Sequence, residues 1–367
     1  MNIPLVDLAA QQAEIADEVR AGLDEVFATT AFIGGPAVAR FEAAYASYVE
    51  VGHVVGVANG TDALELAYRA AGVTRGGEVV VPANTFIATA EAVSRIGAVP
   101  VPVDVDPEHL LMDPAAVRAA VGPRTQAIVP VHLFGQVAPV DEIGKIAADA
   151  GVPMIEDAAQ SQGARHNGRA AGSFGLAAGT SFYPGKNLGA AGDAGAVLSS
   201  DADVARQVRV LAAHGSAHKY DHEVVGVNSR LDAVQAVVLS AKLKRLDAWN
   251  AARRAAAARY AELLDGVDGV RAPVSAEGNE DVWHLYVVQV DERDRVLATL
   301  NAAGIGAGIH YPTPIHLTGA YESLGFGTGS FPVAEAAAER ILSLPLYPHL
   351  TAGQQERVVE VLAQAVR

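Results

Sequence analysis

Hydrophobic and polar positions along the first 200 residues form short apolar runs separated by amphipathic segments. The apolar runs are rich in Val and Ile and cover residues 78–81, 99–103, 127–131 and 153–155. Between them, helical periodicity covers residues 62–71, 88–96, 114–120 and 140–148. Strand and helix signals that alternate in this way predict βαβ units and a mostly parallel sheet with helices on both faces.

The rest of the chain has a different pattern. Residues 193–199 predict one more strand, and Asp201 is a favoured N-cap for a helix that runs to about Ala213. From Arg230 to Leu264 the pattern is continuously helical without Gly or Pro, which predicts one long helix spanning two domains. A strand over 282–290 and helices over 293–303, 333–342 and 352–366 predict a C-terminal α+β domain. We therefore expect a large domain over 1–245, which includes an N-terminal helix, and a small one over 246–367.

Composition and charge narrow the class of protein. The chain has 367 residues, a formal net charge of −15 and no cysteine. No disulfide or Cys-based metal site can form, and we expect no metal. Nucleic-acid binding is not expected, because phosphate contacts need clustered Lys and Arg. No apolar run approaches the length of a membrane span, and no basic and apolar leader begins the chain. These features favour a cytoplasmic enzyme.

The segment with the most informative chemistry is TSFYPGKNLG at residues 180–189. Lys186 follows an apolar, glycine-punctuated run and lies among small residues, where a short loop could hold it out of water. An ordinary lysine has a pKa of about 10.4, so attack on a carbonyl at neutral pH requires desolvation or a cationic neighbour. A P-loop is excluded, since that motif needs glycine at Thr180 and a hydroxyl at Asn187. A surface lysine is the alternative.

Two further motifs supply the partners of such a lysine. An apolar strand ends at Asp157, where open α/β sheets bind ligands. A buried carboxylate there needs a cation, and a protonated pyridine nitrogen is suitable, although Asp157 could instead cap a helix. Upstream, Asn59, Gly60 and Thr61 open a helical pattern and could offer backbone N–H groups to an anion. A phosphate site, an acid and a lysine are together the groups that bind pyridoxal 5′-phosphate (PLP).

Four motifs in this order resemble the DegT/StrS-type family of PLP-dependent nucleotide-sugar aminotransferases. They are NGTDAL at 59–64, EDAAQ at 156–160, SFYPGK at 181–186 and NSRLD at 228–232. The resemblance covers nearly the whole chain. It implies fold type I of the PLP-dependent transferases, with a mostly parallel sheet in the large domain and a smaller α+β domain. It also implies a transaminase that uses L-glutamate as amino donor and pyridoxamine 5′-phosphate as the amino-carrying form of the cofactor.

The resemblance implies a role for each cofactor residue. Lys186 would bind PLP covalently and move the proton in transamination. Asp157 would keep the pyridine nitrogen protonated, and Gln160 would reach the phenolic oxygen; the alternative for Gln160 is a polar side chain on a helical turn. Phe86 would stack on the ring or, alternatively, belong to the core.

The phosphate would be held by residues from two chains. Gly60, Thr61 and Ser181 would hold it from one subunit, and Asn228 would reach it from the other, so the resemblance implies a homodimer with shared active sites. Thr61 and Ser181 could instead be ordinary cap and strand residues. Asn228 could instead cap its own helix, for which Asn is favoured.

The implied substrate is a nucleotide-diphosphate keto sugar. Lys219 and Arg230 would contact the diphosphate across the dimer, on a segment that also carries His214 and Tyr220. The sugar side would be formed by Tyr183, His310 and Tyr311. Of these, His310 and Tyr311 are on a loop that continues through Pro312 and Pro314 to His316. His132 either lines the pocket or is a structural histidine.

The motif NSRLD resembles the sugar 3-aminotransferases within this family. The best interpretation is therefore an enzyme for a dTDP-3-keto-6-deoxyhexose, with a UDP-3-keto sugar acid or a C4-keto sugar as alternatives. Two other classes stay open. One is a PLP-dependent sugar dehydratase, in which a histidine replaces the lysine found here. The other is a PLP-binding regulator, which would need a DNA-binding appendage.

Overall fold

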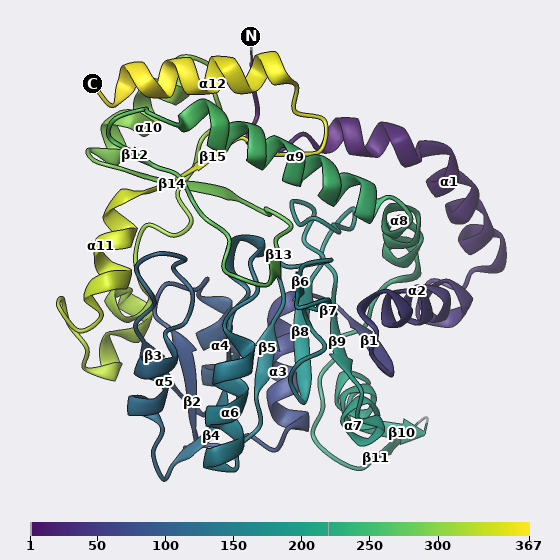
Figure 1. Cartoon of the computed structure of the whole chain (residues 1–367). Helices are drawn as coiled ribbons and strands as arrows, with labels where there is room; N and C mark the ends of the chain where they lie inside the picture. The colour runs from purple at the N-terminus through teal and green to yellow at the C-terminus, as the bar shows by residue number, and fades with distance from the viewer. Residues whose placement is uncertain (1, 219) are drawn as a thin grey trace.

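A mixed but mostly parallel β-sheet forms the centre of the molecule (Figure 1). The computed structural model describes residues 2–218 and 220–367. One part of the sheet has the order β1 (His53–Val57), β9 (Gly195–Ser199), β8 (Ala177–Ser181) and β5 (Ile155–Asp157). The other part has the order β3 (Val99–Val103), β2 (Glu78–Pro82) and β4 (Thr125–Ile128). Parallel bridges from Ile128 to Met154 and from Val131 to Asp157 join β4 to β5.

Strand direction agrees with the sequence-based expectation except at β9. Pairs β2–β3, β2–β4 and β5–β8 are parallel, whereas β9 runs antiparallel to both β8 and β1. Side chains alternate across each strand. In β2, Val79 and Val81 face a core formed with α3 (Gly60–Ala70), α4 (Ala88–Arg95) and α7 (Ala202–Ala212). Val80 faces the opposite core, with α5 (Pro114–Ala120) and α6 (Val140–Ala150).

The N-terminal helix expected within the large domain is present, but the structure has two helices there instead of one. They are α1 (Leu8–Thr29), capped by Asp7, and α2 (Gly35–Val49). Helix α2 packs through Phe41 and Tyr45 against Phe182, which follows β8. These aromatic contacts support the start of the loop that carries Lys186.

The prediction of a single long helix over 230–264 is wrong. The structure has two helices, α8 (Ala233–Leu243) and α9 (Leu246–Leu264), which run in different directions (Figure 1). Helix α8 packs against α1 and α2, whereas α9 packs against the C-terminal sheet. Helical periodicity continues through the junction because both helices have buried faces. The direction changes because these faces pack on different parts of the molecule.

The C-terminal part contains the antiparallel sheet β12 (Val270–Arg271), β14 (Tyr286–Val290) and β15 (Ile341–Leu344). One face is covered by α9, α10 (Arg293–Ala302) and α12 (Ala352–Ala365), and α11 (Pro332–Arg340) packs elsewhere on the sheet. The strand predicted over 282–290 starts only at Tyr286, because Trp283 has the left-handed φ of 47°. The α8–α9 break falls at the expected boundary near residue 245, but the division into two domains stays a prediction.

Shorter elements complete the fold. They are β6 (Arg165–His166), β7 (Arg169–Ala170), β10 (Ser216–His218), β11 (Asp221–His222) and β13 (Asn279–Glu280), and the 3₁₀ turns η1 (Leu133–Gly135), η2 (Ile315–Leu317) and η3 (Gly319–Leu324). Strand β13 pairs with β6 and so ties the C-terminal segment to the large sheet region. No helix in residues 2–218 or 220–367 is long and apolar enough to cross a membrane.

Candidate active site

A cavity of about 490 Å³ lies where the carboxyl ends of β5 and β8 meet the start of α3. Its volume is within the usual range of small-molecule sites, about 300–1,000 Å³. Parts of the chain far apart in sequence form its wall. Of the predicted site residues, it brings together Gly60, Thr61, Phe86, Asp157, Gln160, Ser181, Tyr183, Lys186, His310 and Tyr311.

Lys186 lies on the loop between β8 and β9 and lines the cavity. Its backbone N–H donates to the Tyr183 carbonyl at 2.8 Å. Within the described residues, its side-chain amine has no hydrogen-bond or ion-pair partner. Burial lowers the pKa of this amine to about 8, against the opposing charge of Asp157. A larger fraction of this amine is then neutral at pH 7 than for an exposed lysine.

Asp157 ends β5 and is almost fully buried. Its Oδ2 accepts a hydrogen bond from the Thr89 hydroxyl at 2.7 Å, and its Oδ1 accepts from the Ala159 N–H at 3.1 Å. Burial raises the pKa of this carboxyl, and the Thr89 hydrogen bond is the largest opposing effect. Turns follow Asp157 over residues 158–163. Asp157 is therefore not a helix cap, and Gln160 is not on a helical turn.

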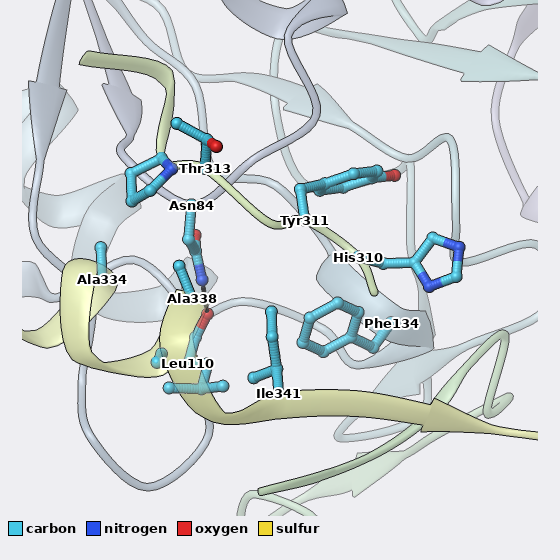
Figure 2. A pocket seen from close by; sticks show the side chains of 11 residues that line it. Asn84, Leu110, Phe134, His310, Tyr311, Thr313, Ala334, Ala338 and Ile341 are labelled. Carbon is cyan, nitrogen blue, oxygen red and sulfur yellow. Dashed lines mark hydrogen bonds between the residues drawn. The ribbon is translucent and has the colours of Figure 1, made fainter. Parts of the chain in front are cut away.

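The Gln160 amide has a fixed orientation. Its Oε1 accepts from the Phe134 N–H at 2.7 Å, so its Nε2 donates to the Tyr311 hydroxyl at 3.1 Å. The Tyr311 ring also contacts Phe86, with centroids 5.1 Å apart. Tyr311 and His310 line both the main cavity and a small pocket of about 10 Å³, which Figure 2 shows. In that pocket, Asn84 donates to the Leu110 carbonyl at 2.8 Å, the bond drawn in Figure 2.

An anion site is formed where α3 begins. Asn59 caps the helix by accepting from the Asp62 N–H at 2.8 Å. The first N–H groups of a helix have no acceptor within it, and the helix dipole favours a negative charge there. A Cβ atom on Gly60 would lie 2.6 Å from the Ser181 Cβ. Glycine at residue 60 thus lets the helix start approach Ser181 closely, and both residues line the cavity.

His284 also lines the cavity, although no sequence motif predicted it there. Asn187 donates through Nδ2 to Asn250 Oδ1 and to the Val282 carbonyl, both at 2.9 Å, so its Oδ1 faces His284 Nδ1 at 3.2 Å. This orientation requires the His284 proton on Nδ1. Burial, and then the charge of Lys186, lower the pKa values of His284 and His310. The feature of the sequence that points to His284 is a polar residue inside the apolar run 282–290, but that run predicts a strand over its whole length.

Other predicted residues lie outside this cavity. Asn228 and Arg230 are exposed and do not line it, and Lys219 lies outside the described residues. Helix α8 has Asp232 as its N-cap residue, so Asn228 does not cap its own helix. His214 and Tyr220 are exposed.

Two histidines considered for the pocket are structural. His132 is fully buried and its Nε2 pairs with Glu156 at 2.8 Å. His316 is 1% exposed and its Nε2 pairs with Glu335 at 3.0 Å.

The residues that line the cavity fit PLP. A helix start beside a serine hydroxyl suits a phosphate group, and a buried carboxylate suits a pyridinium nitrogen. An unpaired amine with a lowered pKa suits an aldehyde carbon. These three groups lie on one cavity of about 490 Å³.

Comparisons with known proteins agree with this site. The model of the DegT/DnrJ/EryC1/StrS aminotransferase family matches residues 13–363. A dTDP-3-amino-3,4,6-trideoxy-alpha-D-glucose transaminase of Streptomyces venezuelae is 44% identical over 99% of this chain and 96% of its own. A UDP-N-acetyl-3-dehydro-alpha-D-glucosamine 3-aminotransferase of Acidithiobacillus ferrooxidans is 45% identical over 99% of this chain and 98% of its own.

The fold is also that of a solved relative. The crystal structure of S. venezuelae DesV in complex with a ketimine intermediate has a TM-score of 0.97 and 44% identity, covering 100% of this chain and 99% of that one. The family is PLP-dependent, and the expected fold type, cofactor and enzyme class are confirmed. The protein is a PLP-dependent sugar aminotransferase, and its chain belongs to the DegT/DnrJ/EryC1/StrS aminotransferase family.

Proposed function

We propose that this enzyme transfers an amino group from L-glutamate to C3 of a nucleotide-linked 3-keto sugar, with a dTDP-3-keto-6-deoxyhexose as the best candidate. The observation that carries the reaction is that Lys186, Asp157 and the Gly60–Ser181 phosphate site face one cavity. The C3 preference is supported by the motif at 228–232 and by the 3-amino sugars in the names of both relatives. A UDP-linked 3-keto sugar acid and a C4-keto sugar are the alternatives.

Lys186, Asp157 and Gln160 would each have a separate role in the reaction. When bound, PLP supplies an electron sink for transamination. Lys186 Nζ would bind the cofactor aldehyde. Once the amino group of the donor has displaced it, the free Nζ would take the proton from the donor carbon and return it in the proton shift. Asp157 would hold the proton on the pyridine nitrogen. The remaining N–H of the Gln160 amide would donate to the cofactor's phenolic oxygen, since its carbonyl end is engaged by Phe134.

The proposal includes a homodimer in which Asn228 and Arg230 act on the site of the other subunit. Both side chains are exposed and lie outside the cavity of their own chain. Three large apolar side chains close together are also exposed. Phe27 and Phe32, at 62% and 41%, have ring centroids 5.4 Å apart, and the neighbouring Ile33 is 53% exposed. Exposed apolar patches of this kind mark surfaces that another protein covers. A second copy of the chain would cover them.

The aminotransferase reaction is tested by the cofactor's absorbance. Addition of L-glutamate to the PLP-loaded enzyme should bleach the visible band to that of the amine form, and a matching keto sugar should restore it. A dehydratase or a regulator would not show this cycle. A panel of dTDP- and UDP-linked 3-keto and 4-keto sugars then identifies the acceptor, and restoration by a 4-keto sugar alone would contradict C3 amination.

Lys186→Ala tests the assignment of the lysine. The variant should fold but form no borohydride-reducible link to PLP, because it lacks the only amine that lines the cavity among the described residues. Lys242→Met is the matched control: burial lowers the pKa of Lys242 to about 8 as well, but this lysine is on α8 and does not line the cavity. A reducible adduct that persists with turnover in Lys186→Ala would contradict the assignment.

A further inference from the structure

Two buried threonines connect Asp157 to the wall of the cavity. Thr89 is on the first turn of α4 and is fully buried, and Thr85 is 2% exposed and lines the cavity. Their hydroxyl oxygens are 2.7 Å apart, and the Thr89 hydroxyl is 2.7 Å from Asp157 Oδ2. The Tyr68 hydroxyl donates to the Thr89 carbonyl at 3.3 Å and so holds the backbone of this turn.

The direction of these hydrogen bonds follows from the charge of Asp157. An ionised carboxylate only accepts hydrogen bonds, and a hydroxyl has a single proton to donate. Thr89 therefore donates to Asp157, and Thr85 must donate to Thr89. Each bond polarises the next one in such a chain. If Asp157 were protonated and donated this bond, the chain could run in the opposite direction. The arrangement is thus sensitive to where the proton near Asp157 resides.

We propose that Thr89, supported by Thr85, is a positioning residue that keeps Asp157 ionised and oriented so that the cofactor's pyridine nitrogen stays protonated. This inference rests on the role of Asp157 in the proposed function. Asp157 is buried, and within residues 2–218 and 220–367 the other oxygen of its carboxylate accepts one hydrogen bond, from a backbone N–H at 3.1 Å. Hydrogen bonds to a charged group are stronger than neutral ones, so the Thr89 hydroxyl is a major stabiliser of the anion.

Removal of the donor should move the proton. The Asp157 carboxylate and the pyridine nitrogen would share one proton, and a carboxylate that loses its hydroxyl donor competes better for that proton. The ring nitrogen then becomes more neutral and a weaker electron sink. This outcome differs from a loss of stability, because a packing defect would not change the protonation state of the ring.

The test uses holoenzyme reconstituted with PLP that is ¹⁵N-labelled in the ring, since the ¹⁵N chemical shift reports ring protonation directly. In Thr89→Val the signal should move toward that of neutral pyridine, and the L-glutamate half-reaction should slow by about tenfold to a hundredfold, the effect of one hydrogen bond to a charged group. Thr89→Ser, which keeps the hydroxyl, should restore both. Thr85→Val should move the signal in the same direction by a smaller amount.

Thr180→Val is the matched control. Thr180 is also fully buried, but its hydroxyl donates to the Ala158 carbonyl. This variant should lower the melting temperature and leave the ring signal unchanged. Asp157→Asn tests the role of Asp157 separately from the role of Thr89. A ring signal unchanged in Asp157→Asn would reject the proposed role of Asp157 itself.

A signal that changes in Asp157→Asn but stays as in wild type in Thr89→Val overturns the inference about Thr89. If Thr89→Val does not fold, Thr89→Ala and Thr85→Val carry the same test. An unchanged signal in the folded members of that pair overturns the inference as well.

Discussion

Position, in addition to reactivity, distinguishes the lysine at residue 186. Burial lowers the pKa of both Lys186 and Lys242 to about 8. Only Lys186 lines the cavity that also contains Asp157 and the anion site at Gly60. A lowered pKa makes the amine a better nucleophile. The surrounding groups would hold the cofactor aldehyde that this amine attacks.

The lowered pKa of Lys186 predicts the pH dependence of cofactor capture. The neutral amine is the nucleophile, so the rate at which apoenzyme binds PLP covalently should rise with pH and level off above a midpoint near 8. Stopped-flow absorbance measures this rate. Asp157→Asn should lower the midpoint, because the Asp157 charge raises the pKa of the amine. A midpoint near 10.4, the ordinary lysine value, would mean that the amine is solvated.

Local motifs predicted much of the cavity, because each motif places its residue at the end of a strand or at the start of a helix. They did not predict Thr89 or His284. Thr89 contacts Asp157 across 68 positions of sequence, and His284 is oriented by Asn187 across 97. Contacts of this kind depend on how α4 and the segment before β14 pack. No local pattern specifies that packing, and the roles assigned to the site residues stay predictions.

Among the elements, the start of α3 determines the shape of the phosphate site. Gly60→Ala should raise the PLP dissociation constant at least about tenfold, because the new methyl group would overlap Ser181, and overpacking costs about 1–3 kcal/mol. Absorbance titration of apoenzyme measures this constant.

Gly144→Ala is the control, since a Cβ at Gly144 would lie 3.8 Å from the nearest atom, the Met154 Cε. This change inside α6 should stabilise the protein by about 0.5–1 kcal/mol and leave PLP affinity unchanged. Equal affinities in the two variants would show that close approach at Gly60 is unimportant.

Periodicity predicted most helices and strands of the large sheet region. It did not predict that the N-terminal region contains two helices, α1 and α2, and it failed at two places further along the chain. At the α8–α9 junction, apolar positions continue without Gly or Pro, so nothing local marks the turn at residues 244–245. At Trp283, an apolar run continues through a left-handed residue. In both cases packing with distant elements outweighs the local pattern.

For the whole molecule, the shared active site is the main open proposal. A mixture of Lys186→Ala and Asn228→Ala chains should form heterodimers in which one site carries both changes and the other carries neither. With random exchange, half of the dimers are mixed, so activity should recover to about a quarter of wild type. Native mass spectrometry verifies the exchange. A mixture no more active than its parents, despite that exchange, would mean that Asn228 serves its own chain.

The reversed strand β9 has a consequence for repeated turnover. Because β9 runs antiparallel to β8, the connecting residues 182–194 begin and end at the same end of this strand pair. Backbone bonds from Phe182 to Ala194 and from Ala190 to Phe182 fasten both ends of this segment. In the proposed reaction Lys186 would release the cofactor and bind it again in every catalytic cycle. A segment fixed at both ends would keep the Lys186 amine at a high effective concentration for that step.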